Sequence, residues 1–149
     1  MSVFCVLAST LISFIVMSFL VIVSMAIVGS TGNKPTMLWI FVNLIQGAIA
    51  AIVGGLTAAQ FPALFSYPVE SCVLSVWGLS FFTGFMTLLT AATSLLSRQE
   101  QPFWYHFVLL FVSQIGIFYG ASLALPLYFP PTYQQYWTAL TRFSFPVYL

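Results

Sequence analysis

The sequence predicts an all-α protein that crosses a membrane four times as one helical bundle, with a C-terminal segment lying at the membrane surface. Only 3% of its residues are charged and 61% are hydrophobic, and the mean hydropathy is +1.07. A soluble domain of this size is roughly a quarter charged. Four apolar runs are each long enough to cross a hydrocarbon core of about 30 Å at about 1.5 Å per residue. Because so few charged side chains cannot cover a water-facing surface, we expect lipid to be the solvent of this polytopic, multi-pass membrane protein.

The chain is expected to form a single transmembrane domain, residues 1–149, in which short turns join antiparallel neighbours. One turn is expected at 60–69, with Ser66 as the N-cap of the third helix and Pro68 in its first turn. The first apolar run is far longer than that of a signal peptide, so it is expected to remain as a span. The predicted spans cover residues 3–28, 37–59, 70–96 and 103–125, and the interfacial tail covers residues 126–149.

The second span is expected to be the inner helix of the bundle, with many neighbours. Two ridges of small residues follow it at four-residue spacing, namely Gly47, Ala51 and Gly55 and, beside them, Ala50, Gly54 and Ala58. The fourth span carries a similar ridge of Gly116, Gly120 and Ala124. Small residues let helix backbones approach closely, which drives association in lipid. We therefore expect the second and fourth spans to make the tightest contact.

Amide side chains inside the spans are the first candidates for a binding site. They are Asn43 and Gln46, one turn apart, and Gln114. Because an unpaired amide in hydrocarbon is costly, all three are expected to face protein. They either line a polar pocket or pore or join helices by hydrogen bonds of about 0.6–2 kcal/mol each. The second role is favoured, because no other polar group is forced to extend them into a path.

Ionisable side chains are so scarce that each is a candidate for chemistry. Glu70 suits a proton donor or a counter-ion, but an acid in the first turn of a helix is also what the helix dipole favours, and we favour this interpretation. His106 is the single histidine, and we expect it at the membrane interface with no chemistry. No metal site and no cofactor is predicted, because ligand partners for the histidine are lacking. The net charge of +1 excludes a nucleic-acid footprint.

The distribution of the few basic residues predicts the orientation. Lys34 and Arg98 fall in the first and third loops, which share one side of an up-down bundle. The positive-inside rule then places the N-terminus outside and loops 30–36 and 97–102 in the cytoplasm. Cys5 and Cys72 both begin helices on the outer side, so a disulfide between them is geometrically conceivable, although two buried thiols are the favoured interpretation.

The tail after Pro126 has two interpretations. Four apolar or aromatic side chains recur at helical spacing, namely Tyr133, Tyr136, Trp137 and Leu140. This pattern is typical of an amphipathic helix lying on the bilayer. It is also compatible with a fifth span that Pro146 cuts short.

Short motifs around the third span resemble a known receptor family. Tyr67-Pro68 is followed by Cys72 and Trp77, the span ends in Leu96-Ser97-Arg98, and Asn33-Lys34-Pro35 precedes the second span. This arrangement is similar to the first spans of fungal and amoeboid seven-helix receptors that carry a regulator-of-G-protein-signalling domain. The resemblance covers about residues 33–98 and implies an outside N-terminus. Three spans and the cytoplasmic domain of those receptors have no counterpart here, so the resemblance implies a truncated or remodelled half, without assumed G-protein coupling.

Two classes of function are compatible with these features. The first is a non-catalytic receptor-like protein or accessory subunit of a membrane complex, contacting membrane lipid and docking through its Gly/Ala ridges on a protein partner or a second copy.

The alternative is a small membrane-embedded enzyme of the cyclase or isomerase type, acting on a lipid or isoprenoid with Glu70 as the proton donor. Its carbocation would be stabilised by cation–π contact with Trp77, Phe81, Phe82 and Phe85. We favour the first class, because acid–base or metal chemistry needs at least two ionisable groups within reach. A transporter or channel ranks third.

Overall fold

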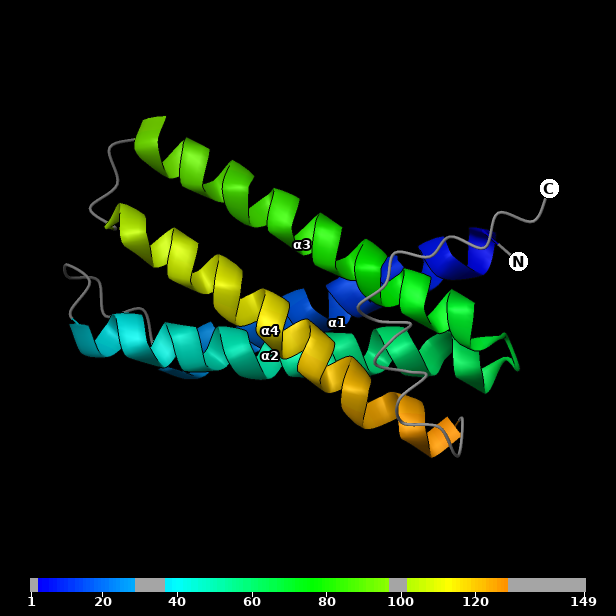
Figure 1. Cartoon of the computed structure of the whole chain (residues 1–149). Coiled ribbons are helices and arrows are strands. Elements are labelled where there is room, and N and C mark those ends of the chain that lie inside the picture. The colour runs from blue at the N-terminus through cyan, green and yellow to red at the C-terminus, as the bar shows by residue number, and fades with distance from the viewer. Residues whose placement is uncertain (1–2, 29–36, 97–101, 129–149) are drawn as a thin grey trace.

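The computed structural model describes residues 3–28, 37–96 and 102–128, and these form four long helices (Figure 1). All four are long and apolar enough to span a membrane. The all-α helical bundle and its four candidate spans therefore confirm the predicted fold class at this level. The loops that carry Lys34 and Arg98 and the tail from residue 129 lie outside the described residues. The helices are α1 (Val3–Val28), α2 (Met37–Leu64), α3 (Val69–Leu96) and α4 (Phe103–Tyr128).

Consecutive helices run antiparallel, so α1 and α3 point one way and α2 and α4 the other (Figure 1). Helix α2 contacts each of the other three, as predicted for the inner helix, and α3 also contacts all three. Among the described residues, α1 and α4 do not contact each other. The tightest pair, α2 with α4, is therefore a parallel pair, joined along the chain only through α3.

The interior of the bundle is rich in small and hydroxyl-bearing side chains, packed around a few large ones such as Leu79 and Ile117, whereas many large apolar side chains lie outside. Ala51, Ala58 and Ser13 are all 0% exposed, while Phe4 is 81% and Phe81 79% exposed. A soluble protein buries its large apolar side chains instead. In lipid, burial of apolar surface drives no association, and close packing of small residues takes its place. The packing thus agrees with a membrane-spanning bundle.

The predicted turn between the second and third spans is corrected by the structure. Helix α2 continues beyond the predicted end at residue 59 and includes Pro62 in its last turn. Ser66 is not an N-cap. It has a φ of 58°, and its N–H donates to the Ala63 carbonyl at 3.0 Å, while the N–H of Tyr67 donates to the Pro62 carbonyl at 3.1 Å. These two bonds are the Schellman pattern that closes a helix C-terminus, so Ser66 ends α2 and does not begin α3.

The proline in the last turn of α2 fits because a second helix compensates for it. Proline has no N–H, so Pro62 leaves the carbonyl four residues earlier, that of Ala58, without its helical partner. The Ser9 hydroxyl of α1 donates to this carbonyl at 3.1 Å, and all three residues are buried. The polar serines of the first span therefore include one that ties α1 to α2. A second proline, Pro126, likewise lies inside α4, which ends three residues later than predicted.

Candidate functional site

The contact between α2 and α4 is made by backbone against backbone. A Cβ atom added to Gly55 would lie 1.9 Å from the carbonyl oxygen of Ile117, and one added to Gly120 would lie 2.0 Å from that of Ile52. Both distances are far inside van der Waals contact, so only glycine fits at either position. This confirms the prediction that the second and fourth spans form the tightest contact.

The same contact extends along both helices in parallel register. A Cβ atom on Gly116 would lie 2.8 Å from the Cβ of Ala51, and one on Gly47 would lie 2.9 Å from a terminal methyl carbon of Leu109. The predicted ridge of Gly47, Ala51 and Gly55 therefore packs against α4, whereas Gly54 of the second ridge faces Leu79 of α3 and Met17 of α1.

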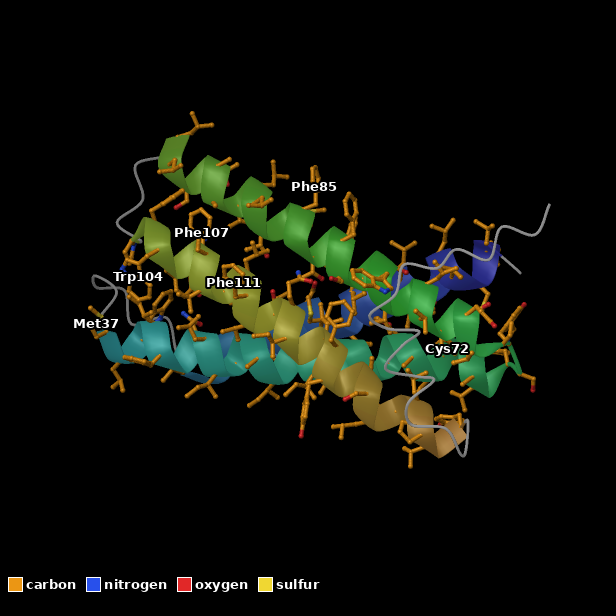
Figure 2. All side chains as sticks on the ribbon, in the orientation of Figure 1. Met37, Cys72, Phe85, Trp104, Phe107 and Phe111 are labelled. Carbon is orange, nitrogen blue, oxygen red and sulfur yellow. The ribbon has the colours of Figure 1, made fainter. Side chains whose placement is uncertain are left out.

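Asn43 and His106 lie at one end of this contact. Asn43 is one turn before Gly47 on the ridge of α2, and His106 is three residues before Leu109 on the facing side of α4. Because Gly47 contacts Leu109, the two polar side chains occupy the same end of the paired helices. Asn43 is 8% exposed and His106 is 4% exposed. Figure 2 shows this end, where the start of α2 lies near the start of α4.

Both side chains present a buried nitrogen with no hydrogen-bond partner among the described residues. These atoms are Nδ2 of Asn43 and Nε2 of His106. The side chain of Tyr105, also buried, lies edge-on to the His106 ring with 5.4 Å between ring centroids. A buried polar group without a partner costs about 1–3 kcal/mol, and more in hydrocarbon. The end of the α2–α4 contact is therefore equipped to bind a hydrogen-bonding group.

Three buried hydroxyls also have no partner in the described part of the chain, but they can satisfy themselves. They are those of Ser13, Ser71 and Thr83. A serine or threonine hydroxyl on a helix can rotate onto a carbonyl of the preceding turn. Ser75 does this, donating to the Ser71 carbonyl at 2.8 Å. The carboxamide and imidazole groups are bulkier and less able to do so, which singles out Asn43 and His106.

The other predicted binding residues have different surroundings. Gln114 joins α4 to α3: its Nε2 donates to the Ser80 carbonyl at 3.2 Å, and the Ser80 hydroxyl donates to its Oε1. It therefore acts in the helix-joining role that was favoured for the amides. Gln46 is half-buried on α2, one turn after Asn43.

The groups required by the enzyme alternative are not brought together. Glu70 is exposed in the first turn of α3, at the opposite end of the bundle from Asn43 and His106. The Trp77 ring packs on Phe118 of α4 at 4.9 Å between centroids. The Phe82 ring packs on Phe14 of α1 at 4.7 Å. Phe81 and Phe85 point outward, as Figure 2 shows for Phe85. The four aromatic side chains thus face three directions.

His106 lies near the start of α4, as an interfacial residue would, but its side chain is buried inside the bundle. The sequence held a signal for this burial, because His106, Leu109, Ser113, Gly116 and Gly120 follow one another at three- or four-residue spacing. They therefore share the face of α4 that meets α2. Within the described ranges, no three His, Cys, Asp or Glu side chains gather in a way that could hold a metal ion.

Comparisons of the chain with protein-family models, with curated proteins and with solved structures found no match.

Proposed function

We propose that this multi-pass membrane protein is a non-catalytic, receptor-like or accessory component of a membrane complex. Its α2–α4 pair is the rigid frame, and Asn43 and His106 at one end of that pair bind a membrane-borne ligand. The ligand supplies a carbonyl or hydroxyl oxygen, which accepts hydrogen bonds from Nδ2 of Asn43 and from a protonated Nε2 of neutral His106. The short motifs around the third span, which resemble those of seven-helix receptors, support a receptor-like role.

One observation carries this proposal. Two polar nitrogens on facing helices, each on a side chain more than nine-tenths buried, lie at the same end of the tightest contact without a partner among the described residues. Two buried polar nitrogens without a partner are unfavourable for stability, and such groups are tolerated where function requires them. A ligand oxygen that accepts from both would remove the cost at once.

The enzyme alternative has less support from the geometry. Its proton donor, Glu70, is exposed beside the α2–α3 turn, and the aromatic side chains that would surround a carbocation are spread over contacts with α1, α4 and lipid. A carbocation needs aromatic faces within about 6 Å on several sides. The described helices do not provide such an arrangement around Glu70.

The test uses the full chain purified from its native membranes in mild detergent. Wild type, Asn43→Leu/His106→Leu and Glu70→Gln are compared by mass spectrometry of the lipids and small molecules that remain bound. We expect a ligand bearing a carbonyl or hydroxyl group in wild type and Glu70→Gln, reduced at least tenfold in the double variant. An equal amount in the double variant would refute the site. A lipid product that disappears in Glu70→Gln would instead establish the enzyme.

A further inference from the structure

Helices α1 and α3 pack side by side in parallel, and the offset between facing residues stays within a narrow range along the contact. The Thr10 hydroxyl lies 3.4 Å from the Ser75 carbonyl oxygen, to which it donates, 65 positions further along the chain. A Cβ atom on Gly78 would lie 2.7 Å from that same hydroxyl, and the Phe14 and Phe82 rings meet at 4.7 Å between centroids. The last two pairs are each 68 positions apart. A residue of α1 thus faces the residue of α3 that lies 65 to 68 positions later.

Cys5 and Cys72 are 67 positions apart, so this register places them opposite each other. Both are buried, Cys5 at 6% and Cys72 at 0% exposure. The two thiols are close enough to interact electrostatically. The neighbours of Cys72 on α3 include Ser71 and Ser75, which are small and 0% exposed, and the Ser75 carbonyl meets Thr10 of α1. Small contact residues allow the close backbone approach that a disulfide requires, which is about 5.5–6 Å between Cα atoms.

We infer that Cys5 and Cys72 form a redox site: oxidation joins them in a disulfide that locks α1 to α3. In this step each thiol loses a proton and one electron, and the S–S bond forms. A disulfide-bearing oxidant takes up the two electrons and two protons and leaves as two thiols. Cys5, near the start of α1, is the more accessible sulfur and forms the mixed disulfide, which Cys72 then attacks.

The location suits such a site. Cys72 lies at the end of the bundle opposite the starts of α2 and α4 (Figure 2). The orientation predicted from Lys34 and Arg98 puts this end on the outer side of the membrane, where disulfides form and persist. Helix α1 contacts only α2 and α3 among the described residues, so a covalent tie to α3 would fix the least enclosed helix of the bundle.

The inference is tested by oxidising the purified full chain in lipid nanodiscs with diamide, an azo compound that converts two thiols to a disulfide and is itself reduced to the hydrazine. The disulfide is detected in two ways. Neither cysteine can then be alkylated under denaturing conditions, and the two cysteine peptides are found linked by a bond that a reductant breaks. The matched control is Phe4→Cys/Cys5→Ser. It moves the thiol by one residue, to a position whose side chain is 81% exposed.

We expect wild type to form the intramolecular disulfide at least tenfold faster than the control, and dithiothreitol to reverse it. The oxidised wild type should also unfold at a temperature about 5 °C or more above that of the reduced protein, because a long loop is closed. Equal rates for the two proteins, or only disulfides between separate chains, would overturn the inference. Asn43→Leu/His106→Leu should cross-link like wild type, so failure of the ligand site and failure of the redox site are distinguishable.

Discussion

The hydrogen bond from Ser9 to the carbonyl of Ala58 gives the sharpest test of the packing. Pro62 withholds the N–H that this carbonyl would otherwise accept, and the Ser9 hydroxyl replaces it at 3.1 Å. Ser9→Ala leaves the carbonyl buried without a partner, which costs about 1–3 kcal/mol by analogy with soluble proteins. Hydrogen bonds between membrane helices measure about 0.6–1.7 kcal/mol. We therefore expect Ser9→Ala to lower the free energy of unfolding by about 1–2 kcal/mol.

Pro62→Ala should make the stability of the bundle independent of the Ser9 hydroxyl. Alanine at position 62 supplies the missing N–H, so the Ala58 carbonyl accepts from its own helix whether or not Ser9 is present. In the Pro62→Ala background, Ser9→Ala should cost less than about 0.5 kcal/mol, giving a coupling energy of about 1 kcal/mol in the double-mutant cycle. The assay is reversible unfolding in mixed detergent micelles, followed by tryptophan fluorescence.

Ser24→Ala is the matched control for this cycle. The Ser24 hydroxyl is also on α1, but it donates to the Leu20 carbonyl of its own helix at 2.6 Å. Its removal should change stability by no more than about 0.5 kcal/mol in either background. Additive effects of Ser9→Ala and Pro62→Ala would show that the hydroxyl does not replace the proline's missing donor, and the reasoning would fail.

Three further predictions use the same unfolding assay. Gly120→Leu should destabilise by about 3 kcal/mol or more, because its Cβ would lie 2.0 Å from the backbone oxygen of Ile52, while Ala92→Leu on the exposed face of α3 should stay within about 0.5 kcal/mol. An unchanged stability of Gly120→Leu would contradict the backbone contact. Asn43→Leu should leave the ligand-free protein as stable as wild type or more so, because a buried donor without a partner is removed; a loss above about 1 kcal/mol would assign Asn43 to helix joining. Gln114→Leu should cost about 0.6–1.7 kcal/mol through its lost bond to the Ser80 carbonyl, and no change would show that this bond adds nothing to the α3–α4 contact.

The helical bundle could be predicted from the sequence because lipid, as the solvent, requires long apolar helices that contact one another through small residues. Lipid leaves no role for apolar burial between helices, so small residues at four-residue spacing mark the contacts. The second and fourth spans could therefore be paired from their ridges of small residues alone. All four predicted spans begin within one residue of the observed helices and three of them end within three residues, but α2 runs past its predicted end because Pro62 misled. Proline predicts a break, and its tolerance depends on Ser9, which lies on another helix and more than fifty positions away.

Of the two residues of the candidate site, only Asn43 could be predicted from the sequence as a binding residue. Asn43 was identified because an amide inside a span is rare and costly. The position of His106, about one turn inside its span, predicts only an interfacial residue. The face of α4 on which His106 lies decides whether its side chain is buried, and its distance from the helix end does not. That face is the one that Gly116 and Gly120 share. A histidine on a glycine ridge is turned toward the neighbouring helix.

The contacts differ in kind, and this determines which helices can move. Between α2 and α4, glycines place backbone against backbone, so a shift of either helix meets carbonyl oxygens that cannot rotate away. Between α3 and α4 the contacts are made by side chains, such as Gln114 with Ser80 and Trp77 with Phe118, which can change rotamer. Helix α1 does not contact α4 in the described part of the chain. A ligand at Asn43 and His106 would therefore meet the closely packed α2–α4 pair, and side chains such as Ser9 and Gln114 join that pair to the α1–α3 pair. A disulfide between Cys5 and Cys72 would remove relative sliding within that pair while leaving the α2–α4 frame unchanged.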